Sequence, residues 1–340
     1  MSKKILFSVL IIALLSLLPI ILGLDYYILL ATYIIFYAAL ASSWYIPGGM
    51  AGQLDFAAAS YLGIGVFISG TLITFWEIPY WVTLPLGGLG AMALAIGLGY
   101  FTFRFGLREV FYALASLASV LSLQFLFLLW KDVGGPIPRY IYQKGLTFMR
   151  FDSNIYYYYL MLFFMIIALL IGYKISKSKL GYFLRCIRDD EDAAEVLGIN
   201  TRACKLKALA IYAFLTGLIG TAYVVFVGSY DYTIFDPEIS LLIVVVALAG
   251  GSRVIYGPFT GALVLVSVRE LFRSQLGAIR GLSWIFYGVV LLVIMLLKPS
   301  GFVTLFEKVY KKNVGKISRS KKESFSKKNK NNREPSHEKD

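Results

Sequence analysis

The sequence predicts an all-α polytopic membrane protein with about ten transmembrane helices, one of them broken or re-entrant, and three observations lead to this class. Of the 340 residues, 58% are hydrophobic and only 16% are charged, whereas soluble domains carry about 25% charged residues. The apolar residues fall in runs of about 20, the length of helix that crosses a bilayer core. Short segments between these runs hold many of the Lys and Arg residues, as in the loops of membrane proteins.

Ten apolar runs are the candidate spans, and they must be helical because backbone amides cannot stay unpaired in lipid. The first follows Lys3 and Lys4 as a signal peptide would, but it is long enough to span and no cleavage site follows, so we expect a retained helix. The eighth is too short to cross alone: it is either half of a broken span or the first limb of a re-entrant hairpin that ends near Leu276. The ten runs are Ile5–Leu24, Tyr26–Tyr45, Phe56–Phe75, Val82–Phe103, Val110–Trp130, Ile155–Tyr173, Leu206–Gly228, Ile239–Gly251, Phe259–Leu276 and Leu282–Leu297.

The loop charges predict how these spans are oriented, because basic loops stay in the cytoplasm. Basic residues place the N-terminus, the 104–108 loop, the long 174–205 loop and the C-terminal segment on the cytoplasmic side. Both termini are then cytoplasmic. The outward loops are Trp76–Trp81, Lys131–Asn154, Ser229–Glu238 and Gly277–Gly281.

Residues 306–340 form a separate basic segment after the transmembrane domain, which covers residues 1–305. The segment holds 12 Lys and Arg against 5 Asp and Glu, and it buries too little apolar surface to fold, so we expect a disordered cytoplasmic tail. It is either a solvated tail without a role or a contact for anionic membrane lipid. The basic residues of the cytoplasmic loops and of this tail account for the net charge of +13, so we expect no nucleic-acid binding.

The chemistry-bearing residues do not form a catalytic or metal site. Cys186 and Cys204 lie in one hydrophilic loop without a CxxC spacing, and His337 lies in the charged tail. We therefore expect two free thiols, no metal, no cofactor and no catalytic residue.

The stretch from Pro47 to Asp55 interrupts the second and third spans with glycine and proline. Non-helical backbone at membrane depth is tolerated only where it lines a cavity or is buried in protein, so Gly52 and Gln53 are candidate pathway residues. A carboxylate in hydrocarbon is costly, so Asp55 should face an interior. It either lines the pathway or caps the helix that follows.

The 174–205 loop contains a short helix with an acidic head. The range Asp189–Asp192 puts negative charge in its first turn, and Gly198 supplies a stop. Alanine and leucine between them fall on one small face, which suits a groove on another protein or packing on the chain's own membrane domain. The candidate docking residues are Arg185, Arg188, Glu191, Asp192, Ala193, Ala194, Leu197 and Gly198.

A second glycine cluster, Ala249–Pro258, joins the eighth and ninth runs. Pro258 falls at an early helical position. Gly250 and Gly251 form either a tight turn, which we favour, or a hinge or gate near the cytoplasmic mouth.

The range Arg185–Asn200 resembles the cytoplasmic coupling loop of LivM-type permeases, the branched-chain amino-acid branch of bacterial ABC importers. Within it, Asp192-Ala193-Ala194 followed by Gly198 is similar to the Glu-Ala-Ala-x-x-x-Gly element that such permeases present to their ATPases. The resemblance covers about residues 30 to 303. It also includes Ala51-Gly52-Gln53, Gly63-Ile64-Gly65, Gly257-Pro258 with Gly261-Ala262, and Tyr287-Gly288 through Lys298-Pro299.

The resemblance implies an inner-membrane permease subunit for branched-chain amino acids. Its implied partners are a second, LivH-like permease, two cytoplasmic ABC ATPases and a periplasmic substrate-binding protein. The sequence itself contains no GxxxxGK[ST] phosphate loop, so ATP hydrolysis is expected in the partners.

Departures from the family leave the cargo open. Asp55, Ala57 and Ala58 stand where the family usually has Ser and then Gly-His, and Arg253 stands where it tends to have glycine. The alternatives are urea, short amides or another small solute, or an ion-coupled secondary transporter with Asp55 as its ionisable residue.

Overall fold

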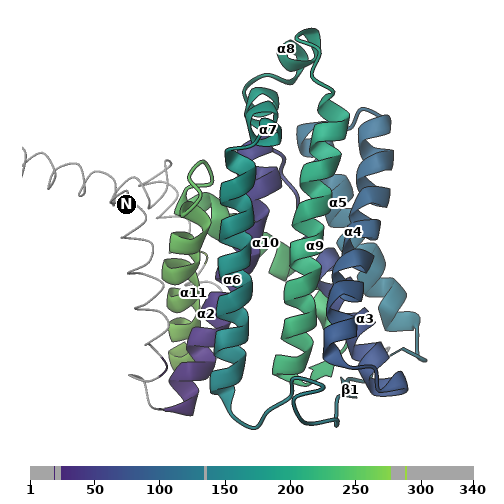
Figure 1. Ribbon diagram of the computed structural model, residues 1–340, viewed down its shortest axis with the longest axis vertical. Helices are drawn as coiled ribbons and strands as arrows, with labels where there is room; N and C mark the ends of the chain where they lie inside the picture. The colour runs from purple at the N-terminus through teal and green to yellow at the C-terminus, as the bar shows by residue number, and fades with distance from the viewer. Residues whose placement is uncertain (1–18, 20–23, 134–135, 277–287, 289–340) are drawn as a thin grey trace, which may run out of the picture.

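The computed structural model describes residues 24–133 and 136–276, together with Pro19 and Gly288, and consists of packed helices (Figure 1). Almost all of the predicted first span, the loop 277–281, the last span, both termini and the tail 306–340 lie outside the described residues. The described elements are α2 (Asp25–Trp44), η1 (Tyr45–Met50), α3 (Ala58–Trp76), α4 (Tyr80–Arg104), α5 (Glu109–Leu129), β1 (Arg139–Tyr140), α6 (Asn154–Ser176), α7 (Lys179–Asp189), α8 (Glu191–Val196), α9 (Thr201–Val227), β2 (Ser229–Tyr230), η2 (Tyr232–Phe235), α10 (Pro237–Gly250) and α11 (Gly257–Leu276).

Six segments of the described chain are helices long and apolar enough to cross a membrane, and they match the second to seventh predicted spans. They are Asp25–Met50, Ala58–Trp76, Tyr80–Arg104, Val110–Leu129, Asn154–Ser176 and Thr201–Val227. Helix α11, predicted as the ninth span, is not among them and carries Arg269, Glu270 and Arg273. Helix α10 has 14 residues, about 21 Å of helix, which is shorter than a bilayer core.

Helices α10 and α11 form an antiparallel hairpin, and its re-entry into the membrane stays a prediction. The helices touch at glycines, because a β-carbon on Gly250 would lie 1.9 Å from the carbonyl oxygen of Gly257. Farther along the hairpin, Arg269 Nη2 donates to Glu238 Oε1 over 2.8 Å. The segment Ala249–Pro258 is therefore a turn between packed helices.

Small residues bring α3, α4 and α9 close together within the bundle. A β-carbon on Gly65 would lie 2.3 Å from the carbonyl oxygen of Gly217, and one on Gly220 would lie 2.4 Å from that of Leu62. Such small-residue contacts let membrane helices approach backbone to backbone. Helices α3, α4 and α9 therefore pack closely against one another.

The described loops gather at the two ends of the bundle in the two groups that were predicted to lie on opposite sides. At one end, strand β1 pairs antiparallel with β2, and the Tyr80 amide donates to the Thr147 carbonyl over 2.9 Å. These contacts join the three described loops that were predicted to face outward. At the opposite end lie α7 and α8, at the top of Figure 1, where β1 is at the bottom.

Candidate functional site

Helices α7 and α8, together with Gly198, project beyond the bundle between α6 and α9 (Figure 1); we call residues 179–198 the projecting arm. The prediction of one short helix headed by Asp189–Asp192 is corrected here. Asp189 ends α7, and Asp190 has extended backbone with φ −161°. The Asp190 carboxylate accepts the Ala193 amide over 2.9 Å, so it breaks the helix and caps α8 as an Asp N-cap does.

The arm ends at Gly198, as predicted. Gly198 has φ +82°, the left-handed conformation that favours glycine. Its amide donates to the Glu195 carbonyl over 2.9 Å, and the Ile199 amide donates to the Ala194 carbonyl over 3.1 Å. This pair of bonds is the Schellman helix stop. A β-carbon on Gly198 would meet nothing within 4 Å, so only the backbone requires glycine.

The predicted alanine and leucine face of α8 is divided between two surfaces. Ala194 is buried and packs in a cluster with Leu184 of α7. Leu197 is 78% exposed and its neighbour Val196 is 88% exposed, and Ala193 is also exposed. The arm thus uses one alanine to hold itself together and presents two larger apolar side chains outward. Sequence reasoning missed Val196, which lies off the helical spacing used to find the face.

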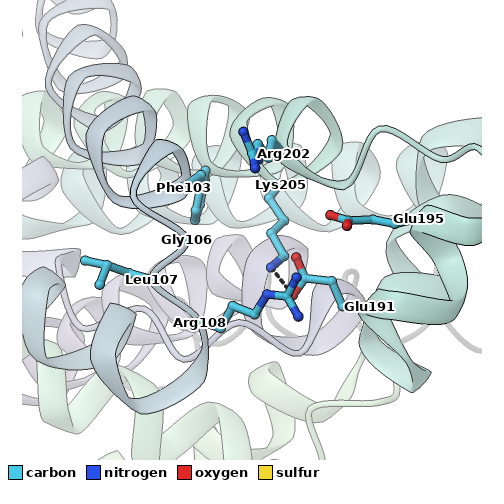
Figure 2. A pocket seen from close by; sticks show the side chains of 8 residues that line it. All are labelled: Phe103, Gly106, Leu107, Arg108, Glu191, Glu195, Arg202 and Lys205. Atoms are coloured by element: carbon cyan, nitrogen blue, oxygen red, sulfur yellow. Dashed lines mark hydrogen bonds and ion pairs between the residues drawn. The ribbon is translucent and has the colours of Figure 1, made fainter.

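The acidic head of α8 is anchored to its own chain, as Figure 2 shows. Glu191 Oε2 pairs with Lys205 Nζ at 2.5 Å, and Asp192 Oδ1 pairs with Arg108 Nη1 at 2.6 Å. Lys205 is 8% exposed. The hydrogen bond with Asp192, followed by the charge of Glu191, raises the pKa of the Arg108 guanidinium, so this cation stays charged. These pairs tie α8 to the α4–α5 loop and to the start of α9.

The pocket between these elements is too small for a solute. Its volume is about 30 Å³, room for about one water molecule. Arg108 and Lys205 were not predicted, because loop charges indicate the side of the membrane but not which charges pair. The lining residues are Phe103, Gly106, Leu107, Arg108, Glu191, Glu195, Arg202 and Lys205 (Figure 2).

Both predicted arginines of α7 turn toward their own chain. Arg185 Nη2 donates to the Ser176 carbonyl at the end of α6 over 2.8 Å. Arg188 Nη1 donates to the Gly49 carbonyl in η1 over 3.0 Å. These contacts place both guanidinium groups beneath the arm rather than on its outer surface.

A second hydrophobic cluster, separate from the core of the bundle, lies under the arm. It joins residues of α7, α8, η1 and α9, and Ile255 of the α10–α11 turn packs against it. The arm therefore rests on the helix break and on the turn. The buried members are Tyr45, Ile46, Met50, Ala51, Leu184, Ile187, Ala194, Cys204, Ala208 and Leu215.

The predicted break after the second span is present, and its glycines make close contacts. Helix α2 continues into a π-helical turn, η1, and the chain is then non-helical from Gly52 to Ala57. Gly52 has φ +70°, and a β-carbon there would lie 2.6 Å from Arg188 Cγ. A β-carbon on Gly49 would lie 2.3 Å from the Ser252 carbonyl oxygen. Glycine thus allows both the arm and the α10–α11 turn to reach this segment.

Asp55 is fully buried, and its carboxylate contacts protein groups. It accepts hydrogen bonds from the Ala57 amide at 2.7 Å, the Tyr112 hydroxyl at 2.5 Å and the Tyr61 hydroxyl at 3.4 Å. The Trp44 indole donates to the Asp55 carbonyl over 2.9 Å. Asp55 therefore joins α2, α3 and α5 at the helix break, whereas the N-cap of α3 is Ala57, without a side-chain cap hydrogen bond.

Gln53 is buried but has no hydrogen-bond partner among the described residues for either end of its amide. Buried amides are almost always paired in proteins, so this side chain has capacity for a further partner. Gly250 and Gly251 lie in the packed hairpin, where Gly251 ends α10 at φ +108°. The five predicted pathway residues are thus divided between the break and the hairpin turn.

The described part of the chain contains no group of three or more potential metal-ligating side chains. Cys186 is an exposed free thiol on the arm, and Cys204 is a buried free thiol in α9.

Six apolar spans and the arm between α6 and α9 define a multi-pass membrane protein. The chain belongs to the family described as branched-chain amino acid transport system permease components, whose sequence profile matches residues 26–295. Members of this family are transport components rather than enzymes, and the chain is a LivM-type permease.

Two curated relatives support the assignment. Each is a "high-affinity branched-chain amino acid transport system permease protein LivM", one from Escherichia coli K12 and one from Salmonella typhimurium LT2. Each is 25% identical over 304 residues, an alignment that covers 81% of this chain and 69% of the relative. No solved structure matches the chain.

Proposed function

We propose that this protein is the permease subunit of an ATP-binding-cassette importer that moves branched-chain amino acids across the bacterial inner membrane. The observation that carries the proposal is the projecting arm. It lies at the end of the bundle where the predicted cytoplasmic loops gather, and it ends in the glycine stop of the coupling element. The family and both relatives support a transport permease, and their names support branched-chain amino acids as the substrate.

The exposed side of α8 is the surface that we propose for the ATPase. Val196 and Leu197 are apolar and almost fully exposed outside the spans, and Ala193 lies beside them. Apolar side chains in this position suit a groove on a partner. Glu191 and Asp192 act differently in this proposal: they fix the orientation of α8 through Lys205 and Arg108.

The complete transporter in this proposal has four further components. They are a second, LivH-like permease, two cytoplasmic ATPases and a periplasmic binding protein. We propose ten segments in the membrane, the first and last within residues 5–24 and 282–297, with both termini cytoplasmic. The tail 306–340 would then lie beside the anionic inner leaflet.

Within the permease, we propose that Gln53 faces the route of the substrate in the assembled pore. Its unpaired amide supports this role. Gly52, Gly250 and Gly251 would be points of movement around the route, and Asp55 would hold the break together. An ion-coupled mechanism would need to free the Asp55 carboxylate from the three groups of this chain that bind it, so we favour the ATP-driven machine.

Reconstitution into liposomes tests this function. The permease is combined with a partner permease, ATPases and a binding protein that neighbouring genes encode. Uptake of radiolabelled leucine, isoleucine, valine and urea into the liposomes is then measured. We expect accumulation of the amino acids only with ATP inside and the binding protein outside. Uptake that continues without the ATPases would overturn the mechanism, and uptake of urea alone would overturn the cargo.

A further inference from the structure

Arg188 connects the arm to the helix break. Its guanidinium donates to the Gly49 carbonyl over 3.0 Å, and its side chain is 21% exposed. The neighbouring Asp189 carboxylate lies 3.2 Å from Arg188 Nη2 and orients the group. A charged donor makes a stronger hydrogen bond to a carbonyl than a neutral one. Arg188 is therefore a firm contact between α7 and η1, two elements far apart in the sequence.

The backbone of the break is shaped around the stem of this arginine. The left-handed conformation of Gly52 and the absence of a β-carbon there allow Arg188 Cγ to lie against the main chain. The head and the stem of Arg188 thus contact residues on either side of the end of η1. A displacement of α7 relative to η1 would disturb both contacts.

The same π-helical turn touches the α10–α11 turn on its other side. Gly49 lies against the Ser252 carbonyl, and Ile255 packs on the cluster that contains Tyr45 and Met50. The turn η1 ends helix α2, and the chain beyond it is non-helical from Gly52 to Ala57. The order of contacts is arm, Arg188, Gly49, Ser252.

We propose that Arg188 is a positioning residue that transmits movement of the projecting arm to η1 and, through Gly49 and Ser252, to the α10–α11 turn. This inference rests on the proposed function, because it assumes a motor that moves the arm. It assigns Arg188 to transmission within the permease and not to the surface that binds the ATPase.

The test uses the complete transporter in liposomes with three variants. Arg188→Met keeps the aliphatic stem over Gly52 but removes the donor to Gly49. Arg188→Lys keeps the stem and one charged donor. Arg104→Met is the matched control, because Arg104 lies at the same end of the bundle and its guanidinium bonds Tyr100 of its own helix.

Two quantities separate transmission from docking. The first is leucine uptake relative to ATP hydrolysis, together with the yield of copurified ATPase. The second is the response to ATP of a fluorophore attached at Arg253→Cys, an exposed position on the α10–α11 turn, in a Cys186→Ser background. Cys204 is buried and stays in place.

For Arg188→Met we expect normal copurification of the ATPase, uptake per ATP reduced about tenfold, in the range of allosteric couplings, and no fluorescence response at position 253. Arg188→Lys should restore a clear part of the uptake per ATP and of the fluorescence response, and Arg104→Met should behave as wild type. If Arg188→Met does not assemble, Arg188→Gln, too short to reach Gly49, replaces it with the same expectation.

An unchanged uptake and fluorescence response in Arg188→Met would overturn the inference. So would loss of ATPase copurification in that variant, because Arg188 would then be a docking residue. Failure of the wild-type transporter to use ATP would instead overturn the proposed function, and the two failures are therefore distinguishable.

Discussion

The contacts of the charged residues in the arm, rather than their positions in the sequence motif, indicate the role of each. Arg185 and Arg188 bond carbonyls of this chain, and Glu191 pairs with Lys205. The exposed surface is left to apolar Val196 and Leu197. A sequence motif can name residues of a coupling element without showing which of them a partner would touch.

Gly198 offers a test of docking at the level of one residue. Gly198→Glu places a charged side chain beside Leu197. Replacing glycine at this positive φ costs about 1 kcal/mol in backbone strain, and the new β-carbon meets no other atom of the chain within 4 Å. We expect normal membrane insertion and loss of ATPase copurification. Gly145→Glu is the matched control, with φ +110° and the same open space at the opposite end of the bundle. Normal ATPase yield with Gly198→Glu would contradict the proposed surface.

At the scale of elements, the two ion pairs that anchor α8 differ in burial. We therefore expect them to contribute differently to the stability of α8. Glu191→Gln leaves the ammonium group of Lys205 buried without a charged partner, which we expect to destabilise α8 by about 2 kcal/mol. Asp192→Asn weakens an exposed pair and should cost less than about 1 kcal/mol. Amide hydrogen exchange of residues 191–197 measures both. Equal exchange rates in the two variants would show that burial of Lys205 does not matter for the arm.

Substitution of two glycines by alanine should have opposite effects on stability, because Gly65 lies in the contact between α3 and α9 and Gly97 lies in open space. Gly65→Ala would place a methyl group 2.3 Å from the Gly217 carbonyl oxygen, where neither backbone can yield, so we expect little folded protein. Gly97→Ala in α4 meets nothing within 4 Å and should stabilise the helix by about 0.5–1 kcal/mol. Thermal unfolding of the purified permease in detergent distinguishes them. A wild-type melting temperature for Gly65→Ala would show that the bundle is less tightly packed than described.

At the scale of the whole molecule, the two ends of the bundle differ in the side of the membrane that we propose for each. Cys186 lies exposed on the arm, and Tyr142 is 80% exposed at the other end. A membrane-impermeant maleimide added to intact cells should label Tyr142→Cys in a Cys186→Ser background. It should label wild-type Cys186 only after the membrane is permeabilised. The reverse result would invert the proposed orientation.

The sequence by itself determined the class of protein, six of its spans and the position of the projecting arm. Apolar runs must become helices in lipid, and a glycine stop and an acidic head are local signals. Glycine and proline within Pro47–Asp55 likewise predicted the break there. These features depend on residues within one segment, so they can be seen without the fold.

Only the tertiary structure decided how those segments meet. It showed that Ile239–Gly251 forms a hairpin with α11, that Asp190 divides the arm into two helices, and that Asp55 is bound by tyrosines from α3 and α5. It also brought Arg188, Gly49 and Ser252 together from three distant parts of the chain. A pattern of residue types records what each segment can bury or bond, whereas the partner that it finds depends on the packing of every other helix.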